Sequence, residues 1–256
     1  MIPRAYLTEW GVLAPWPTVT QIEQDLILSR LIAEIAAHPL LSRELAFRGG
    51  TCLHKLHLRR SYRYSEDLDY VRINNTPRLG DAFSALREIA IERVGLHEHR
   101  RSFPTEESDV ACIWFDAEPT SEEGLIRVKI EINTAETDPF RECLLRPYAV
   151  HSRWWSGSAD VPTFDLNELL ATKLRALYQR RKGRDLFDLW VALDTTSVDD
   201  QLVAEALSHY MRESTFSYRQ LDQNLQGKLE DRGFLEDVDR LVAELLRFPR
   251  FVGPRR

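Results

Sequence analysis

The stretch that decides the fold runs from Phe47 to Asp69 and reads FRGGTCLHKLHLRRSYRYSEDLD. Two adjacent glycines, Gly49 and Gly50, follow a short apolar run and precede a helical pattern over residues 51–59. Because glycine has no Cβ, the backbone can approach a phosphate group there, and a helix N-terminus favours anions. This part of the stretch predicts a phosphate-binding turn.

The second half of the stretch carries two acidic residues with strand spacing. Asp67 and Asp69 are two residues apart in a segment of strand propensity that continues to Ile73, and a period of two places both carboxylates on one face. Carboxylates are ligands for Mg²⁺, and a metal pair can clamp both oxygens of a phosphoryl displacement. Alone, Gly-Gly is usually a turn and Asp-x-Asp a solvated strand end. In this order they favour nucleotidyl transfer.

Composition limits the classes of protein to consider. The 256 residues have 43% hydrophobic and 29% charged side chains, which is ordinary for a soluble globular protein. The net charge of -6 means that any polynucleotide contact must use local basic patches. Cys52, Cys112 and Cys143 lack metal-ligand spacing and do not suggest a disulfide framework. With no signal-peptide core and no membrane-spanning apolar stretch, we expect no membrane association and a cytoplasmic location.

The flanking sequence predicts alternating helices and strands. Residues 1–19 resemble an irregular arm, with Trp10 and Trp16 packing on the core. A helix should run from Gln21, capped by Thr20, to Pro39, with a short helical turn at 41–45. Further expected segments are a helix at 79–94, paired strands at 110–117 and 125–133, a closing strand near 148–150, and a linker at 156–160.

Glu131 is the candidate for a third carboxylate. It alternates with the apolar residues Ile130 and Ile132 and therefore lies on the polar face of its predicted strand. By strand pattern alone, a solvated face is the simpler interpretation. The alternative is that Glu131 joins Asp67 and Asp69 across the sheet.

Two segments of the stretch resemble a known family. Arg48-Gly49-Gly50-Thr51-x-Leu53-x-Lys55, followed by Arg63-Tyr64-Ser65-x-Asp67-Leu68-Asp69, is similar to the signature of AbiEii-type nucleotidyltransferase toxins (AbiEii/AbiGii, MenT-like). These belong to toxin–antitoxin and abortive-infection systems and to the DNA polymerase β-like nucleotidyltransferase superfamily. The superfamily usually has Gly-Ser where this chain has Gly-Gly-Thr, so the resemblance is to the toxin branch. It covers roughly residues 20–195 and implies that Glu131 is the third acidic residue.

The second half of the chain reads as helices. Asp165 can cap a helix over 166–181, with Gly183 just past its end, and Lys173 falls inside the apolar stripe of that helix. Lys173 either extends its ammonium to the edge of the stripe or points into a cleft, and we favour the cleft because a buried charge needs a partner. Further helices are expected at 184–193, 198–212, 218–231 and 234–247.

The helix at 184–193 carries Asp185 and Asp188 three residues apart in an apolar segment. Asp185 can stabilise the N-terminus of the helix through the helix dipole, whereas this explanation does not apply to Asp188. Glu168-x4-Lys173 followed by Arg184-Asp185-x-x-Asp188 resembles downstream AbiEii motifs with an essential lysine and aspartate. Which aspartate corresponds stays open, with Asp188 preferred.

Four basic residues, Arg180, Arg181, Lys182 and Arg184, form the densest basic run near the proposed site. They can be a charged helix end or a contact for triphosphate or RNA backbone. A second cluster is Arg59, Arg60 and Arg63.

These observations predict an α/β (α+β) fold with a polymerase β-like nucleotidyltransferase core and a mixed sheet, followed by a helical C-terminal domain. The expected divisions are an arm at 1–19, the core at 20–156 and the helical domain at 163–256. The active cleft should lie between core and helices. The expected nucleotide contacts are Gly49, Gly50, Thr51, Lys55, Ser65, Lys173 and Asp185.

In this scheme the resemblance supplies the reaction. It implies transfer of a nucleoside monophosphate from a nucleoside triphosphate, with Mg²⁺ or Mn²⁺ held by Asp67, Asp69 and Glu131. It also implies tRNA 3′ ends as acceptor and a cognate antitoxin as partner. Lys173 and Asp188 complete the expected catalytic set. The alternatives are nucleotidylation of a protein hydroxyl, or a GTP- or ATP-binding regulator without turnover.

Overall fold

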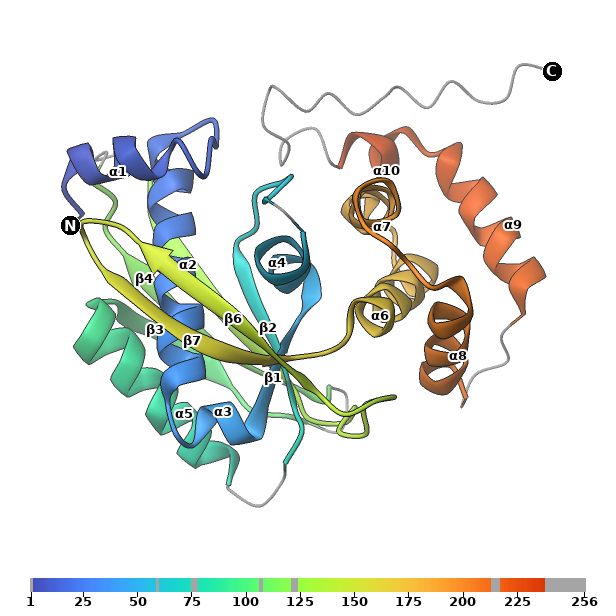
Figure 1. Cartoon of the computed structure of the whole chain (residues 1–256), viewed down its shortest axis with the longest axis horizontal. Helices are drawn as coiled ribbons and strands as arrows, with labels where there is room; N and C mark the ends of the chain where they lie inside the picture. The colour runs from blue at the N-terminus through green and yellow to red at the C-terminus, as the bar shows by residue number, and fades with distance from the viewer. Residues whose placement is uncertain are drawn as a thin grey trace.

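A seven-stranded mixed sheet forms the centre of the molecule (Figure 1). The computed structural model describes residues 2–58, 60–74, 78–105, 108–120, 124–212 and 217–237. The strands lie in the order β3-β4-β5-β2-β1-β7-β6, so the sheet mixes local hairpins with crossovers. Two neighbouring pairs, β2 with β5 and β1 with β7, are parallel, and the other pairs are antiparallel. The mixed sheet expected from the sequence is confirmed.

The strand register brings distant acidic residues together. The strands are β1 (Leu45–Arg48), β2 (Asp67–Arg72), β3 (His97–Ser102), β4 (Val110–Ala117), β5 (Ile126–Asn133), β6 (Leu144–His151) and β7 (Ser156–Thr163). In the parallel pair of β2 and β5, Asp69 lies opposite Glu131 and Asp67 opposite Lys129. The alternating residues of β5, such as Ile130 and Ile132, are fully buried. One face of the central strands is therefore core and the other carries charge.

Helices on the core face bury that apolar surface. α2 (Val19–Ala37) packs against β7, β5, β6 and β2. α3 (Leu41–Glu44), α5 (Leu79–Arg87) and the π-helical segment η2 (Glu88–Val94) complete this layer. Most apolar side chains of α2 and η2 belong to the same buried cluster as Phe47, Ile113 and Phe115.

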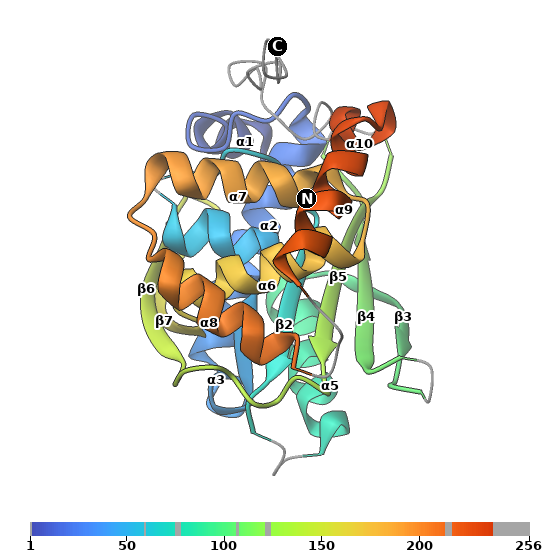
Figure 2. The same ribbon diagram turned by 90° about the vertical axis from the view of Figure 1, so that its right-hand side faces the viewer.

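The helices that follow β7 pack against one another. α4 (Gly49–Cys52) and the π-helical segment η1 (Leu53–His57) leave β1 and lie between α2 and α6 (Figure 1). α6 (Leu166–Gln179) contacts η1, α7 (Gly183–Thr195), α8 (Asp200–Tyr210) and α9 (Tyr218–Leu229), and α10 (Arg232–Glu236) packs on α9 and α7. Figure 2 shows these helices in front of one part of the sheet, while β3, β4 and β5 stay uncovered beside them.

The beginning of the chain differs from the sequence prediction. The expected irregular arm contains a helix, α1 (Arg4–Trp10), although Trp10 and Trp16 do pack on the core as expected. Both indole nitrogens donate to the carboxylate of Asp25 on α2. α2 begins with Thr18 as its cap, not Thr20, because Thr18 and Gln21 form a reciprocal capping box.

Other element boundaries also differ from the sequence prediction. The linker expected at 156–160 is wrong: these residues are in β7, which pairs with β6 and β1. Gly183 does not follow a helix but begins α7, where the carbonyl oxygen of Phe234 leaves no room for a Cβ. β3 was not predicted, because its polar run HEHRRS has no apolar alternation. Most of the helix expected at 234–247, and Arg59, lie outside the described residues.

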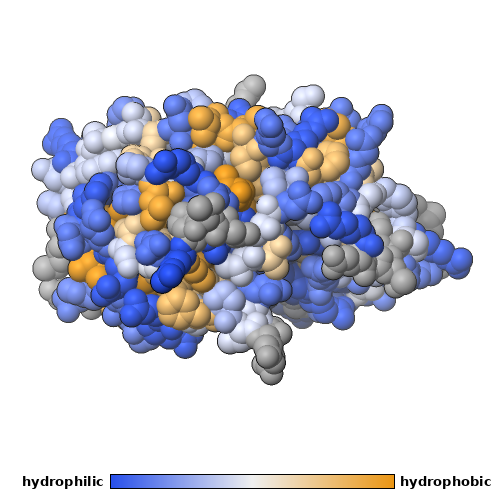
Figure 3. All heavy atoms as spheres, turned by 90° about the horizontal axis from the view of Figure 1, so that it is seen from below, coloured by the Kyte–Doolittle hydropathy of each residue, from blue (hydrophilic) through white to orange (hydrophobic). Residues whose placement is uncertain are grey.

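In the part of the chain that the structure describes, no helix is long and apolar enough to cross a membrane. The lower side of the molecule is largely hydrophilic, with apolar residues in small separate groups (Figure 3).

Candidate active site

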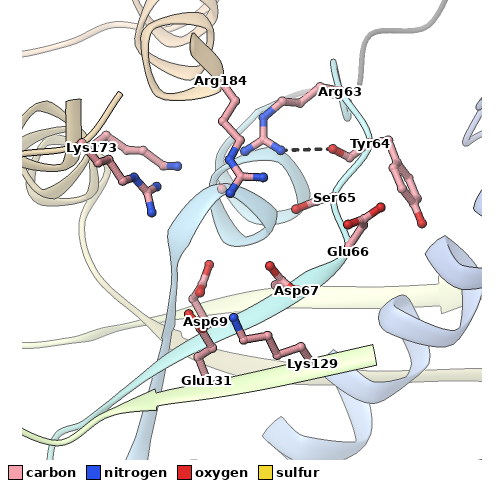
Figure 4. A pocket seen from close by; sticks show the side chains of 12 residues that line it. Arg63, Tyr64, Ser65, Glu66, Asp67, Asp69, Lys129, Glu131, Lys173 and Arg184 are labelled. Atoms are coloured by element: carbon pink, nitrogen blue, oxygen red, sulfur yellow. Dashed lines mark hydrogen bonds and ion pairs between the residues drawn. The ribbon is translucent and has the colours of Figure 1, made fainter. Parts of the chain in front are cut away.

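The three predicted carboxylates line one pocket of about 160 Å³ (Figure 4). Asp67 and Asp69 come from the start of β2, and Glu131 comes from β5 beside Asp69. Five cationic side chains join them, Lys129 from β5 itself and four from other segments. The full lining is Gly50, Arg63, Tyr64, Ser65, Glu66, Asp67, Asp69, Lys129, Glu131, Lys173, Arg180 and Arg184.

Burial and the proximity of the acidic residues raise the pKa values of Asp67 and Asp69. Burial, followed by the charges of Glu131 and Asp67, raises the pKa of Asp69 to about 6. Burial also raises the pKa of Asp67, with the Lys129 charge opposing the shift. Carboxylates that repel one another in a buried place are stabilised by a cation.

The side chains present fit a divalent cation in their chemistry, because all three candidate ligands are carboxylate oxygens. The side chain of Glu131, however, forms an ion pair with Lys129 on the same strand. Among the described residues no three carboxylate, histidine or cysteine side chains lie close enough together to hold one ion. The Lys129 ammonium and a bound cation would therefore compete for Oε1 of Glu131.

Neighbouring side chains occupy the space that a Cβ would fill at both glycines, so glycine is required there whether or not a phosphate binds. Gly49 has φ +82°, and a Cβ there would lie 2.1 Å from Asp69 Oδ2. At Gly50 a Cβ would lie 2.0 Å from Arg63 Nη2 and 3.1 Å from Asp188 Oδ2. The diglycine thus lets the backbone pass between the Asp69 carboxylate and the buried side chains of Arg63 and Asp188.

Thr51 and Ser65 connect the turn to β2. Thr51 Oγ1 lies 2.6 Å from Ser65 Oγ and 2.6 Å from the carbonyl oxygen of Asp67. Thr51 is buried and is absent from the pocket wall, whereas Ser65 lines it. In this structure Thr51 positions the start of β2, and Ser65 is the hydroxyl that faces the pocket.

Asp188 is the centre of a buried charge cluster, which comprises Asp188, Arg63, His54, Lys173 and Asp185. Arg63 donates to Asp188 twice, Nε to Oδ1 at 2.6 Å and Nη2 to Oδ2 at 2.8 Å. His54 Nε2 lies 2.9 Å from Oδ1, and Lys173 Nζ lies 2.8 Å from Oδ2. Each oxygen of this carboxylate therefore has two partners.

The protonation states in the cluster follow from these contacts. The backbone N–H of Tyr62 donates to Nδ1 of His54, so His54 is a neutral ring that donates from Nε2 to Asp188. Burial alone raises the pKa of Asp188, but the charges of Arg63 and Lys173 outweigh it and hold that pKa well below its usual range. Asp188 stays ionised, which fixes the Lys173 ammonium at the pocket wall.

Asp185 is the second carboxylate that pairs with Lys173, and its Oδ1 lies 3.2 Å from Nζ. It also accepts from Arg180, Nε to Oδ2 at 2.7 Å and Nη2 to Oδ1 at 2.8 Å. Burial raises the pKa of Asp185, and the hydrogen bond from Arg180 and the Lys173 charge more than offset it. The predicted catalytic cleft residue Lys173 therefore lies between both aspartates of α7, closer to Asp188.

With this geometry established, comparison with known proteins places the chain in a family. The family model described as "Nucleotidyl transferase AbiEii toxin, Type IV TA system" matches residues 30–252. The chain belongs to this family. The AbiEii match extends past residue 195 through the C-terminal helices, which is further than the motifs alone suggested.

Solved structures agree at the level of fold. MenT4, a nucleotidyltransferase toxin from Mycobacterium tuberculosis, is 16% identical, with a TM-score of 0.67 over 96% of this chain and 85% of that one. A candidate nucleotidyltransferase from Helicobacter pylori is 17% identical, with a TM-score of 0.50 over 90% and 88% of the two chains. A search of curated proteins gave no match. The nucleotidyltransferase toxin fold expected from the sequence is confirmed.

Not every predicted nucleotide contact of this AbiEii family member lies in the pocket. Lys55 points to α2, where its ammonium lies 2.7 and 2.8 Å from the two oxygens of Asp25 and 3.0 Å from Ser29 Oγ. The Asp25 charge, acting against burial, raises the pKa of Lys55. In this structure Lys55 lies outside the pocket and ties η1 to α2.

Only part of the basic run at 180–184 lines the pocket. Arg180 and Arg184 line the pocket. Arg181 instead pairs at 3.2 Å with Asp231, which lies between α9 and α10. Lys182 precedes α7 as an exposed residue and is not among the lining residues. Two of the four residues predicted to contact RNA therefore face the pocket, and the other two lie outside it.

Sequence reasoning missed the roles of Arg63, His54 and Lys129. Arg63 looked like a member of a basic cluster and no site role was predicted for His54, because only the tertiary structure brings α7 to them. A signal existed for Arg63, because an apolar helix carrying Asp188 needs a buried cation somewhere in the chain. Lys129 shares its strand face with Glu131, so its place in the pocket follows from strand alternation.

Proposed function

We propose that this protein transfers a nucleoside monophosphate from a nucleoside triphosphate to the 3′ end of an RNA, with tRNA as the leading acceptor. The observation that carries the proposal is one pocket in which Asp67, Asp69 and Glu131 face Lys173 and Arg184. Acids at one wall and cations at the other match the charges of a metal-bound triphosphate. Membership of a nucleotidyltransferase toxin family supports the same reaction.

Asp67 and Asp69, joined by Glu131, are the residues that would hold Mg²⁺ or Mn²⁺. A bound divalent cation supplies charge neutralisation at the transferring phosphoryl group and lowers the pKa of the attacking hydroxyl. Ser65 and the backbone at Gly50 line the same pocket and are placed to bind phosphate oxygens.

Lys173 is placed to neutralise the leaving pyrophosphate. Its ammonium keeps two carboxylate partners, Asp188 and Asp185, so its position is fixed before the substrate arrives. A preorganised charge contributes more to catalysis than one that must be oriented during the reaction. Arg180 and Arg184 add positive charge on the same side.

The family description supports a proposal for the biological role. We propose that transfer to tRNA 3′ ends blocks aminoacylation and translation, and that a cognate antitoxin neutralises the protein, as the type IV toxin–antitoxin description of the family suggests.

Pyrophosphate release separates this enzyme from a nucleotide-binding regulator. Purified protein is incubated with Mg²⁺, total tRNA and each nucleoside triphosphate in turn. Wild type should release pyrophosphate with at least one triphosphate, and Asp69→Asn should lose at least about a hundredfold in rate because a metal ligand is replaced by a neutral amide. Asp160→Asn, on exposed β7, is the matched control and should keep the rate. Nucleotide binding without pyrophosphate release would reject the proposal.

A further inference from the structure

The sheet continues beyond the pocket as an uncovered face. Lys129 and Glu131 on β5 lie opposite Trp114 and Cys112 on β4. On the edge strand β3, Arg100 lies opposite Trp114. Residues that pair directly across strands share a face, so these side chains extend from the pocket wall to the sheet edge.

The two faces of these strands differ sharply. On the core face, Ile113 and Phe115 are fully buried beneath the helix layer. On the pocket face, Trp114 is half-buried and Arg100 is exposed. In the part of the chain that the structure describes, no helix covers this side of β3 and β4 (Figure 2).

The uncovered face combines cations with an aromatic ring. The guanidinium of Arg100 lies over the ring of Trp114, 4.0 Å from its centroid. Arg127, from the same face of β5, pairs with Asp116 at 2.9 Å, and both ends of that pair reach solvent. An exposed pair of this kind contributes little to stability, so Arg127 can exchange partners at low cost.

We propose that this face binds the single-stranded 3′ end of the RNA acceptor and delivers it to Glu131. The platform residues are Arg100, Trp114, Arg127 and Lys129. This inference rests on the proposed function, because the platform is the surface on which the RNA acceptor of the proposed reaction would bind.

The geometry fits unpaired nucleotides. Arg100 and Lys129 lie two strand spacings apart, about 10 Å. Sheet-based RNA-binding domains likewise stack two or three bases on the face of a sheet. Base stacking on aromatic and arginine side chains together with backbone contacts to cations is the usual recognition of single strands. The platform is continuous with the active pocket, since Lys129 belongs to both. The cations around Lys173 lie on the opposite wall, where the triphosphate binds.

Adjacent arginines on the edge strand provide a matched test. Arg100 lies on the platform face, whereas Arg101 lies opposite the buried Ile113 and therefore on the other face. Binding of a fluorescein-labelled single-stranded RNA hexamer is measured by anisotropy over a range of salt concentrations, in an Asp69→Asn background that prevents turnover. Arg100→Ala with Arg127→Ala should weaken binding about tenfold and reduce the slope of log K against log salt by about 1.4. Arg101→Ala should leave both unchanged.

The aromatic ring is tested separately. Trp114→Leu keeps apolar bulk and should weaken hexamer binding by at least about fivefold, whereas Trp114→Phe should retain most of it. In transfer assays with the active protein, the platform variants should raise the KM for RNA and leave the KM for the triphosphate unchanged.

The binding measurement does not depend on turnover, so it separates the two proposals. Weaker hexamer binding in the platform variants supports the platform even if no transfer to RNA occurs. Equal binding by wild type, the double variant and Trp114→Leu overturns the platform even if transfer is observed. A change in the KM for the triphosphate alone also overturns it.

Discussion

Arg63 is the residue whose loss should cost the most stability in the charge cluster. Arg63→Met removes two buried hydrogen bonds to Asp188 and leaves that carboxylate with only Lys173, which Asp185 shares, to balance its charge. Since breaking a buried ion pair is strongly destabilising, the variant should lower the free energy of unfolding by about 3–5 kcal/mol. Arg232 pairs with Glu236 at 2.6 Å on the surface, with 90% of its side chain exposed. Arg232→Ala is the control and should change stability by less than about 1 kcal/mol. Urea denaturation compares both, and equal losses would contradict the role of Arg63.

Gly49 is predicted to control Asp69. A Cβ at Gly49 would meet the Asp69 carboxylate and would force a side chain onto a positive φ, so Gly49→Ala should displace Asp69, the proposed metal ligand. We expect a fall in pyrophosphate release of at least about tenfold, since small misplacements at a reacting centre are costly. Gly80→Ala, on α5 with no atom within 4 Å of the added Cβ, should keep the rate. An unchanged rate in Gly49→Ala would remove the steric account of the diglycine.

At the scale of elements, η1 carries a titratable group that the fold keeps neutral. Burial, assisted by the Arg146 charge, lowers the pKa of His57 to about 4. A group with a folded pKa below its unfolded value of about 6.5 takes up a proton first in the unfolded chain, so stability falls as pH drops from about 6.5 to 4. The His57 share of that loss is on the order of 3 kcal/mol.

The measurement is the free energy of unfolding across that pH range, for wild type and His57→Leu. The variant keeps apolar packing but cannot titrate, so its stability should decline less steeply between pH 6.5 and 4. Parallel curves for the two proteins would show that His57 does not bind its proton differently in the folded state.

Elements with strong periodicity were predictable from sequence, and those set by tertiary contacts were not. The alternation around Ile130 and Ile132 predicted β5, and Asp165 predicted the start of α6. β7 was mistaken for a linker because the small polar residues 156–160 carry no strand pattern, and only pairing with β6 makes them a strand. Lys55 and Arg63 lie in the same motif region, yet one pairs with α2 and the other with α7, which local sequence does not encode.

At the scale of the whole molecule, the active pocket lies where two groups of elements meet. The sheet supplies Asp67, Asp69 and Glu131, and α6 and α7 supply Lys173 and Arg184. Asp188 links them, because its carboxylate contacts Arg63 before β2 and Lys173 on α6. The division into a nucleotidyltransferase core and a helical C-terminal domain stays a prediction, but the site needs both parts.

Transfer to an RNA 3′ end is the central claim, and blocking that end tests it most directly. Protein, Mg²⁺ and an α-labelled triphosphate are incubated with total tRNA, either intact or treated with periodate to destroy the terminal ribose diol. We predict label in intact tRNA, none in oxidised tRNA, and none with Asp69→Asn. Label in the protein, or equal label in intact and oxidised tRNA, would contradict the claim.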